Sequence, residues 1–478
     1  MLQFKDVKTT ATASPVLFLL AILTFVFGGQ SVQAEKDVQP NILFLFSDDQ
    51  RPDTIGALGN PIIQTPNLDR LVKQGTSFTR ATCAYPLCFP SRTEILTGCT
   101  GFRNKVFLSN RDANLSLPTL PAVLNKAGYQ SYWVGKWHMA GRPMSRGFTE
   151  SLGLFASGRR PKKPQFDSKG RIVTGYVGWM FQTDDRKLMP ERGVGLTPNI
   201  SQIFAESAIE LLKRKSDKPF FLYVNFTAPH DPLLIPPKWD NVYDWRKMKV
   251  PENFLPRHPF DHGNFNGRDE KLLPWPRTKE DIKKELATYY AVISHMDEQI
   301  GKILDVLKET GQADHTIVVY ASDHGLALGS HGLMGKQNMY EHTINVPLIF
   351  RGPEIPEGKI SNAQCYLRDL FPTFCDFANT PKPKSLQSRS LLPILKNQTN
   401  EIYPFIVGYY RHAQRMIRTD RWKLIQYPEA KKTQLFDLIN DPYELNNLSE
   451  KTECASIKQD LNHLLADWLR EHQDPLQK

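Results

Sequence analysis

The sequence predicts an α/β fold with a central, mostly parallel sheet flanked by helices. Four short runs of β-branched and aromatic residues are typical of strands buried on both faces of a sheet. These runs are residues 41–46, 129–134, 219–226 and 316–320. Segments with apolar residues at helical spacing lie between them, at 117–127, 200–212 and 286–307. Strands that alternate with helices favour a parallel sheet.

Each of the four runs ends in unusual polar residues. They are Asp48 and Asp49 after the first run, Lys136 and His138 after the second, His230 after the third, and Asp323 and His324 after the fourth. Ligands of parallel α/β sheets bind beyond the carboxyl ends of the strands. The four strand ends therefore predict a common functional site.

The remaining elements are two insertions and a C-terminal unit. Residues 156–198 and 235–280 are rich in Pro, Gly or charge. We expect them to be surface loops that either form the rim of the substrate site or are solvent-exposed and take no part in binding. Residues 381–390 have the composition of a linker or a long loop. Short strand patterns at 415–425 and 434–438, then a helical pattern at 457–472, predict a small α+β subdomain. We expect a catalytic domain over 35–380 and this subdomain over 381–478.

The first 34 residues have the pattern of a signal peptide. Lys5 and Lys8 precede an apolar stretch at 15–28, and Val32 and Ala34 provide small residues for cleavage. The stretch is short for a membrane span, which needs about 20 residues. We expect cleavage near Ala34, export to the periplasm, a lumen or the medium, and no stable membrane insertion. The alternative is an uncleaved N-terminal anchor.

Composition narrows the class of protein. The chain has 478 residues, with 60 Lys and Arg against 50 Asp and Glu, and six cysteines. These values exclude a collagen, a coiled-coil rod, a disordered chain and a disulfide scaffold. The net charge of +10 suits an anionic partner such as nucleic acid, anionic lipid or a sulfated or phosphorylated glycan. The basic residues are dispersed and no nucleic-acid module is present, so we expect no nucleic-acid partner.

The segment 87–98 contains a candidate nucleophile. Pro90 suits the first turn of a helix, which would place Cys88 at the N-terminus, where the helix dipole stabilises negative charge. Arg92, one turn later, can face the same site. Cys88 is therefore either an activated nucleophile or a buried or disulfide-bonded cysteine.

Three carboxylates at strand ends indicate a metal site. Asp48, Asp49 and Asp323 offer the hard oxygen ligands that Ca²⁺ and Mg²⁺ prefer. Without a cation they would repel one another. The alternative for each residue alone is a helix cap or a turn.

The motif Cys88-x-Pro-Ser-Arg92, followed by Thr97-Gly98, resembles the signature of the sulfatase family in the alkaline-phosphatase superfamily. Further motifs occur in that family's order: Asp48-Asp49, Gly135-Lys136-Trp137-His138, Pro229-His230, Asp323-His324-Gly325 and Gly335-Lys336. The resemblance covers residues 38 to 445 and includes arylsulfatases and iduronate-2-sulfatase-like enzymes. Many members have Asn at the position of His324.

The resemblance implies a set of roles. Cys88 would be oxidised by a maturation enzyme to Cα-formylglycine (3-oxoalanine), whose hydrated form attacks sulfur. The implied ligands of Ca²⁺, or of Mg²⁺, are Asp48, Asp49, Asp323, His324 and the modified Cys88. The implied roles of the other residues are charge neutralisation by Arg92 and Lys136, proton transfer by His138, sulfate contact by His230 and Lys336 with His230 protonating the leaving oxygen, and a further sulfate contact by Ser157.

The resulting hypothesis is an exported sulfuric ester hydrolase that acts on a sulfated carbohydrate, such as a glycosaminoglycan-like polysaccharide. The alternatives are a phosphonate monoester or phosphodiester hydrolase of the same superfamily, and an inactive protein that binds sulfated glycans. Outside these motifs, we expect His295 and Asp297 on a helix surface, and His331 and His342 either lining the pocket or in structural roles. Five cysteines besides Cys88 leave at least one unpaired within the chain.

Overall fold

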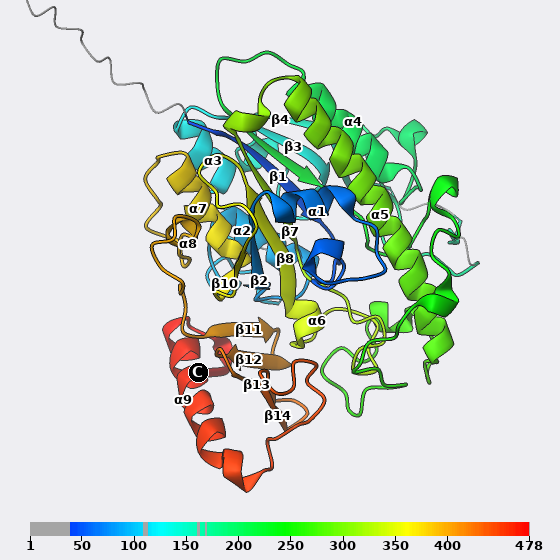
Figure 1. Ribbon diagram of the computed structural model, residues 1–478, viewed down its shortest axis with the longest axis vertical. Helices are drawn as coiled ribbons and strands as arrows, with labels where there is room; N and C mark the ends of the chain where they lie inside the picture. Colours follow the sequence, from blue (N-terminus) through cyan, green and yellow to red (C-terminus); the bar gives the residue numbers. More distant parts are fainter. Residues whose placement is uncertain (1–38, 109–112, 160–162, 168–169, 478) are drawn as a thin grey trace, which may run out of the picture. The chain divides into compact units, whose positions relative to one another are not determined.

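A sheet of ten described strands forms the centre of the computed structural model (Figure 1). The structure describes residues 39–477 except 109–112, 160–162 and 168–169, so the predicted signal peptide lies outside it. The strand order is β10-β2-β8-β7-β1-β6-β3-β4-β5, with β9 paired to β2. The strands are β1 Asn41–Ser47, β2 Thr76–Thr82, β3 Gln130–Lys136, β4 Glu150–Ser157, β5 Trp179–Phe181, β6 Phe220–Asn225, β7 Thr316–Ser322, β8 Asn345–Arg351, β9 Lys359–Ser361 and β10 Cys365–Tyr366.

The four predicted strands are the adjacent strands β7, β1, β6 and β3, and their pairings with one another are parallel. Leu43 of β1, for example, pairs with Val318 of β7 on one side and Leu222 of β6 on the other. The sheet is mixed toward its ends, because β8 runs antiparallel to β7 and β2, and β5 runs antiparallel to β4. The predicted fold class is confirmed.

Helices cover both faces of the sheet. The helices are α1 Pro66–Lys73, α2 Cys88–Thr97, α3 Leu120–Lys126, α4 Ile200–Leu212, α5 Lys279–Glu309, α6 Glu341–Ile344, α7 Leu370–Phe377, α8 Leu392–Leu395 and α9 Ala455–Glu471. On β1, Leu43 and Leu45 pack into a core with α1, α4 and α5. Phe44 and Phe46, which point the other way, pack into a second core with α2, α3 and α7. This alternation is expected for a strand buried on both faces.

A second, antiparallel sheet lies in the C-terminal part of the chain. It consists of β11 Ile406–Tyr410, β12 Gln414–Arg418, β13 Trp422–Tyr427 and β14 Lys432–Asp437. Helix α9 packs on it through Leu461, Leu465 and Trp468, in a core with Met416 and Leu424. Residues 381–390 contain no helix or strand, as predicted, whereas β11 is a strand that the sequence pattern did not reveal.

Two predictions about single residues need correction. His295 and Asp297 lie on α5, but both are buried and not on its surface. Asp297 accepts hydrogen bonds from the backbone N–H groups of Asn67 and Leu68, so its carboxylate holds the first turn of α1. All six cysteines are buried free thiols. Among the described residues, no helix combines the length and the apolar character that crossing a membrane requires.

Candidate active site

The polar residues after β1, β7, β6 and β3 meet at one edge of the sheet. This follows from the register, because the four strands are parallel neighbours and their carboxyl ends point the same way. The seven residues named at these strand ends include Asp48, Asp323 and Lys136, whose side chains are completely buried. A group of ionisable side chains without solvent contact needs partners for every charge.

Helix α2 delivers Cys88 to this edge. Cys88 is the first residue of the helix, and every residue of α2 is buried. The Sγ atom of Cys88 lies 3.3 Å from Nε2 of His324. Burial alone would raise the pKa of the Cys88 thiol, but the positive charges of Lys136 and Lys336 hold that pKa well below its usual range. The position therefore stabilises negative charge.

Arg92 joins α2 to three strands. Its Nε donates to Asp323 Oδ2 at 3.0 Å, and its Nη2 lies 3.3 Å from Asp48 Oδ1. Its Nη1 donates to Asn225 Oδ1 at 2.8 Å. Since all three nitrogens face protein oxygens, Arg92 in this structure orients the carboxylates.

Asp48 and Asp49 each pair with a different lysine. Lys136 Nζ lies 2.5 Å from Asp48 Oδ2, and Lys336 Nζ donates to both oxygens of Asp49 at 2.8 and 2.7 Å. Burial raises the pKa of Asp48, but Lys136 and Arg92 outweigh it, so that the pKa lies well below its usual range. Both lysines are therefore site residues and not surface residues.

The end of β3 reaches Asp48 because residue 135 is a glycine. Gly135 has a φ of +92°, and a Cβ atom there would lie 2.0 Å from the carbonyl oxygen of Asn225. Only a glycine fits so close to β6 in this conformation. The register between β3 and β4 also shifts at this residue. Gly135 thus sets the position of the following Lys136.

The structure brings the predicted metal ligands into two overlapping groups. Ligand atoms of Asp48, Cys88, Asp323 and His324 lie within 4.8 Å of one another, and Asp49 forms a second such group with Cys88 and His230. Burial and the charge of Asp48 raise the pKa of Asp323 to about 7. The protein's own cations therefore do not keep every carboxylate ionised at neutral pH. A divalent cation would do so, and the Asp oxygens fit Ca²⁺ or Mg²⁺.

Two histidines at this edge have opposite electrostatic environments. Burial lowers the pKa of His138 to about 4. Burial also disfavours the charge of His230, but Asp49 and Asp231 outweigh it and raise the pKa of His230 to about 10. His138 is therefore neutral and His230 protonated at neutral pH. Such a separated pair suits a base and an acid in one site.

Ser157 lies apart from the buried cluster. It is the exposed last residue of β4, and it lines a cavity of about 230 Å³ that His138 and Phe89 also line. Because Phe89 follows Cys88 directly in α2, this cavity adjoins the cluster. Trp179 and Arg142 lie on the same cavity wall.

Sequence patterns missed four side chains of the site. The Tyr176 hydroxyl donates to Asp48, and Asp231 forms a salt bridge with Arg268, 2.8 Å between Oδ1 and Nη2, beside His230. Tyr176 and Arg268 come from the weakly periodic insertions, where no local pattern marks a position. Asn225, which accepts from Arg92, is the last residue of β6 and the next-to-last residue of the predicted strand 219–226, so its location near a strand end was an available signal.

Comparisons with known proteins agree with this geometry. A sequence profile described as Sulfatase matches residues 40–380, and one described as N-sulphoglucosamine sulphohydrolase, C-terminal, matches residues 329–471. An N-acetylglucosamine-6-O-sulfatase of Bacteroides thetaiotaomicron is 28% identical, over 98% of this chain and 93% of that protein. An arylsulfatase of Clostridium perfringens is 28% identical, over 87% of this chain and 91% of that protein.

A solved structure extends the likeness to three dimensions. It shows a protein in complex with its substrate D-glucosamine-2-N,6-O-disulfate, with a TM-score of 0.71 and 25% identity, and covers 91% of this chain and 99% of that one. The Sulfatase profile spans most of the chain, including all of the strand ends that build the buried cluster. This protein therefore belongs to the sulfatase family and is a sulfatase.

Proposed function

We propose that this protein is exported and removes sulfate from a sulfated carbohydrate, with a formylglycine formed from Cys88 and with Ca²⁺ or Mg²⁺. The observation that carries the proposal is the buried cluster at the N-terminus of α2, where Cys88 meets carboxylates and lysines. The net reaction adds water across the O–S bond and gives an alcohol, sulfate and a proton.

Asp48, Asp323 and His324, together with position 88, would hold the cation, and Asp49 is the candidate fifth ligand. A bound divalent cation supplies positive charge beside an anionic sulfate. Lys136 and Lys336 add fixed positive charge near Cys88, since both act on its thiol. Preorganised positive charge of this kind stabilises a transferring oxyanion group.

An aldehyde at position 88 supplies, when hydrated, an oxygen nucleophile with a second hydroxyl group through which sulfate can leave. His138, which is neutral, would accept a proton at position 88, because the Cys88 thiol and this ring act on each other's pKa. His230, which is protonated, would donate the proton that the leaving alcohol oxygen requires. Asp231 holds the His230 ring through an Nδ1–Oδ1 distance of 3.1 Å.

Two comparisons, one cavity and the predicted signal peptide support a carbohydrate substrate. The N-acetylglucosamine-6-O-sulfatase resembles this chain over almost its whole length, and the solved relative binds a sulfated glucosamine. The cavity beside His138 has the polar Ser157 and Arg142 and the aromatic Trp179 on its wall, a combination that suits a sulfated sugar. The predicted signal peptide would bring the enzyme to extracellular or periplasmic glycans.

Turnover of matched esters tests the proposal. Purified protein is assayed with an aryl sulfate, an aryl phosphonate monoester and an aryl phosphodiester, and then with a panel of defined sulfated saccharides that includes glucosamine 6-sulfate. We expect the highest kcat/KM on sulfate esters and sulfate release from at least one saccharide. A large preference for phosphorus esters would favour the phosphonate or phosphodiester alternative. Binding of sulfated saccharides without any turnover would favour the inactive glycan-binding alternative.

A further inference from the structure

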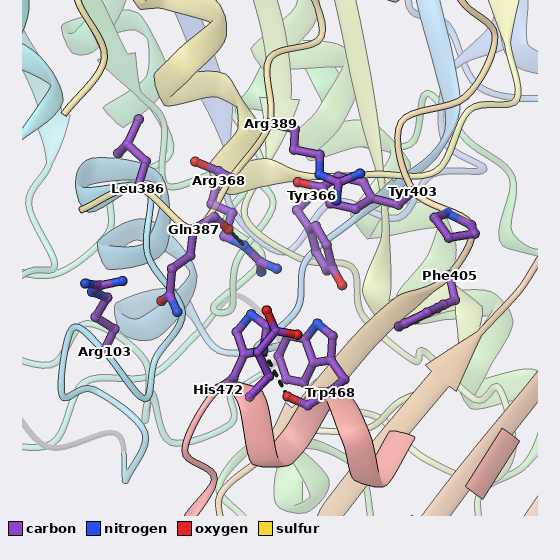
Figure 2. Close-up of a pocket in the computed structure, with 13 residues that line it drawn as sticks. Arg103, Tyr366, Arg368, Leu386, Gln387, Arg389, Tyr403, Phe405, Trp468 and His472 are labelled. Carbon is purple, nitrogen blue, oxygen red and sulfur yellow. Dashed lines mark hydrogen bonds between the residues drawn. The ribbon is translucent and has the colours of Figure 1, made fainter. Parts of the chain in front are cut away.

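A cavity of about 570 Å³, larger than the one beside His138, lies between helix α9 and the loops that follow α7 (Figure 2). In Figure 2, Arg103 lies on one side of this cavity and Phe405 on the other, with Arg368 above and the rings of Trp468 and His472 below. We call it the α9 pocket. Its volume is in the range of about 300–1,000 Å³ that is typical of small-molecule sites.

The α9 pocket is separate from the buried cluster. Gln387 in its wall donates a backbone hydrogen bond to the carbonyl of Gly98, 2.9 Å, directly after the C-terminal end of α2. Cys88 begins α2 at the opposite end. A helix of this length measures about 15 Å. The pocket therefore opens at the far end of the helix that carries Cys88.

Positive charge predominates in the lining. Arg368 is buried and forms a salt bridge with Glu94, Nη1 to Oε2, at 3.2 Å. Arg103 and Arg389 are exposed, and neither forms a salt bridge with any residue of the described ranges. Glu471 is the carboxylate among the lining residues. Two arginines thus retain guanidinium nitrogens for an anionic ligand.

Aromatic rings lie beside these arginines. The Arg389 guanidinium is 4.8 Å from the centre of the Tyr403 ring, which holds it at the pocket rim. On the opposite wall, the His472 ring stacks on Trp468 with centroids 3.8 Å apart and an angle of 11°. Aromatic faces and guanidinium groups in one pocket provide contacts both for apolar ring faces and for planar anions.

We propose that the α9 pocket is a second, non-catalytic binding site for a sulfated saccharide. Arg103 and Arg389 would bind sulfate oxygens through paired N–H donors, and Tyr403 and the Trp468–His472 pair would contact the sugar rings. The choice of a sulfated ligand rests on the proposed function, whereas the pocket itself rests on its own contacts. A second site on the same chain raises the effective concentration of a polymeric substrate at the enzyme.

Hydrogen–deuterium exchange of the full-length protein tests the pocket directly. The probe is a sulfated tetrasaccharide prepared from heparin, added to a Cys88→Ala variant so that turnover does not consume it. We expect the probe to slow exchange in residues 386–405 and in the last turns of α9. In the same background, Arg103→Gln/Arg389→Gln should abolish this protection and weaken binding at the pocket about tenfold or more.

A charge-matched control is Lys213→Ala/Lys215→Ala, which removes two exposed cations after α4. It should keep the protection. Loss of protection in this control, equal protection by the desulfated tetrasaccharide, or equal protection by a single-stranded oligonucleotide of the same charge would each overturn the inference. Absence of protection in the Cys88→Ala variant, together with aryl sulfate turnover by the wild-type protein, would refute the pocket and leave the proposed function standing. Protection in the variant without aryl sulfate turnover by the wild-type protein would refute the proposed function and leave the pocket standing.

Discussion

The two ends of helix α2 both border buried charges, but the charges are arranged differently. At the C-terminal end, Oε1 of Glu94 accepts from the Tyr409 hydroxyl and from the backbone of Gly101, and Oε2 accepts from Arg368, so that both oxygens of this single carboxylate face donors. At the N-terminal end, four potential ligand atoms lie within 4.8 Å of one another. Here Asp48 and Asp323 present oxygens to the same small space.

This difference shows what distinguishes a site from a structural ion pair. Burial of charge is common to both ends, and so are arginine–carboxylate pairs. Only the N-terminal end brings groups of the same charge together. These are the carboxylates of Asp48 and Asp323, and each raises the energy of the other's negative charge. We therefore expect changes at the N-terminal end to alter chemistry and changes at the C-terminal end to alter stability.

The largest expected effect is that of Cys88→Ala. Removing the residue from which the nucleophile forms should lower kcat for aryl sulfate by about 10⁴-fold or more. The matched control is Cys83→Ala, another buried thiol, which is close in sequence and lies outside the cluster, and which should stay within about threefold of wild type. Equal activity of Cys88→Ala and wild type would contradict the assignment.

Metal removal should have the next largest effect. Chelation followed by desalting should reduce kcat by about 10³-fold, because the site loses the charge that faces the sulfate. Adding Ca²⁺ or Mg²⁺ should restore activity and raise Tm, since the cation binds only the folded cluster. Full activity of a preparation with no detectable metal would show that the carboxylates serve another purpose.

Glu94→Gln tests the C-terminal end of α2. The change leaves the buried Arg368 without its counter-ion and should lower the free energy of unfolding by about 3 kcal/mol, measured by urea denaturation. Aryl sulfate kcat should remain within about threefold of wild type. Asp48→Asn, at the other end, should instead abolish most of the activity. If both variants lost activity to the same degree, the distinction between the two ends would fail.

The smallest effect concerns three buried histidines, His258, His331 and His342, which are uncharged at neutral pH. His331 stacks on Tyr340 with ring centroids 3.8 Å apart, and neither ring nitrogen of His342 has a partner within the described residues. Burial lowers the pKa of His331 to about 3 and that of His258 to about 4, and burial also lowers that of His342. Both histidines of the Lys336 segment are thus buried and neutral at neutral pH.

These folded-state pKa values lie below the ordinary value of 6.5, so the unfolded chain binds more protons between pH 6.5 and pH 4. The contribution of these neutral histidines to the free energy of unfolding is therefore fully present above pH 6.5. It is lost as the pH decreases through that window. Between pH 7 and pH 5, the free energy of unfolding of His342→Phe should fall by about 2 kcal/mol less than that of wild type. Urea denaturation at each pH measures this difference. Parallel pH profiles of the two proteins would argue against a neutral, buried His342.

The sequence predicted the four central strands of the sheet because these strands are local apolar runs. The ends of these strands could also be predicted, since Asp48 and Asp323 each follow the last apolar residue of a run after a single serine. Tyr176 and Arg268 were missed because loop residues reach the site through tertiary contacts that leave no periodic pattern. The burial of Asp297 was missed for a related reason, because α1 covers a face of α5 that looks polar in sequence.

The residues of the α9 pocket were even harder to predict from the sequence. Its arginines and rings come from separate segments around residues 103, 366, 389, 403 and 468, which no spacing rule connects. Ser157, by contrast, was proposed from the resemblance alone, and the structure places it in the cavity beside His138. Its contact with sulfate stays a prediction.

The most direct test of the account is the mass of the peptide that contains Cys88, from protein purified from its native host. We predict a peptide about 18 Da lighter than the encoded sequence, because conversion of the thiol to an aldehyde replaces sulfur by oxygen and removes two hydrogens. The aldehyde should also react with a hydrazide probe. An unmodified Cys88 thiol in a preparation that hydrolyses aryl sulfate at its full rate would contradict the proposed chemistry.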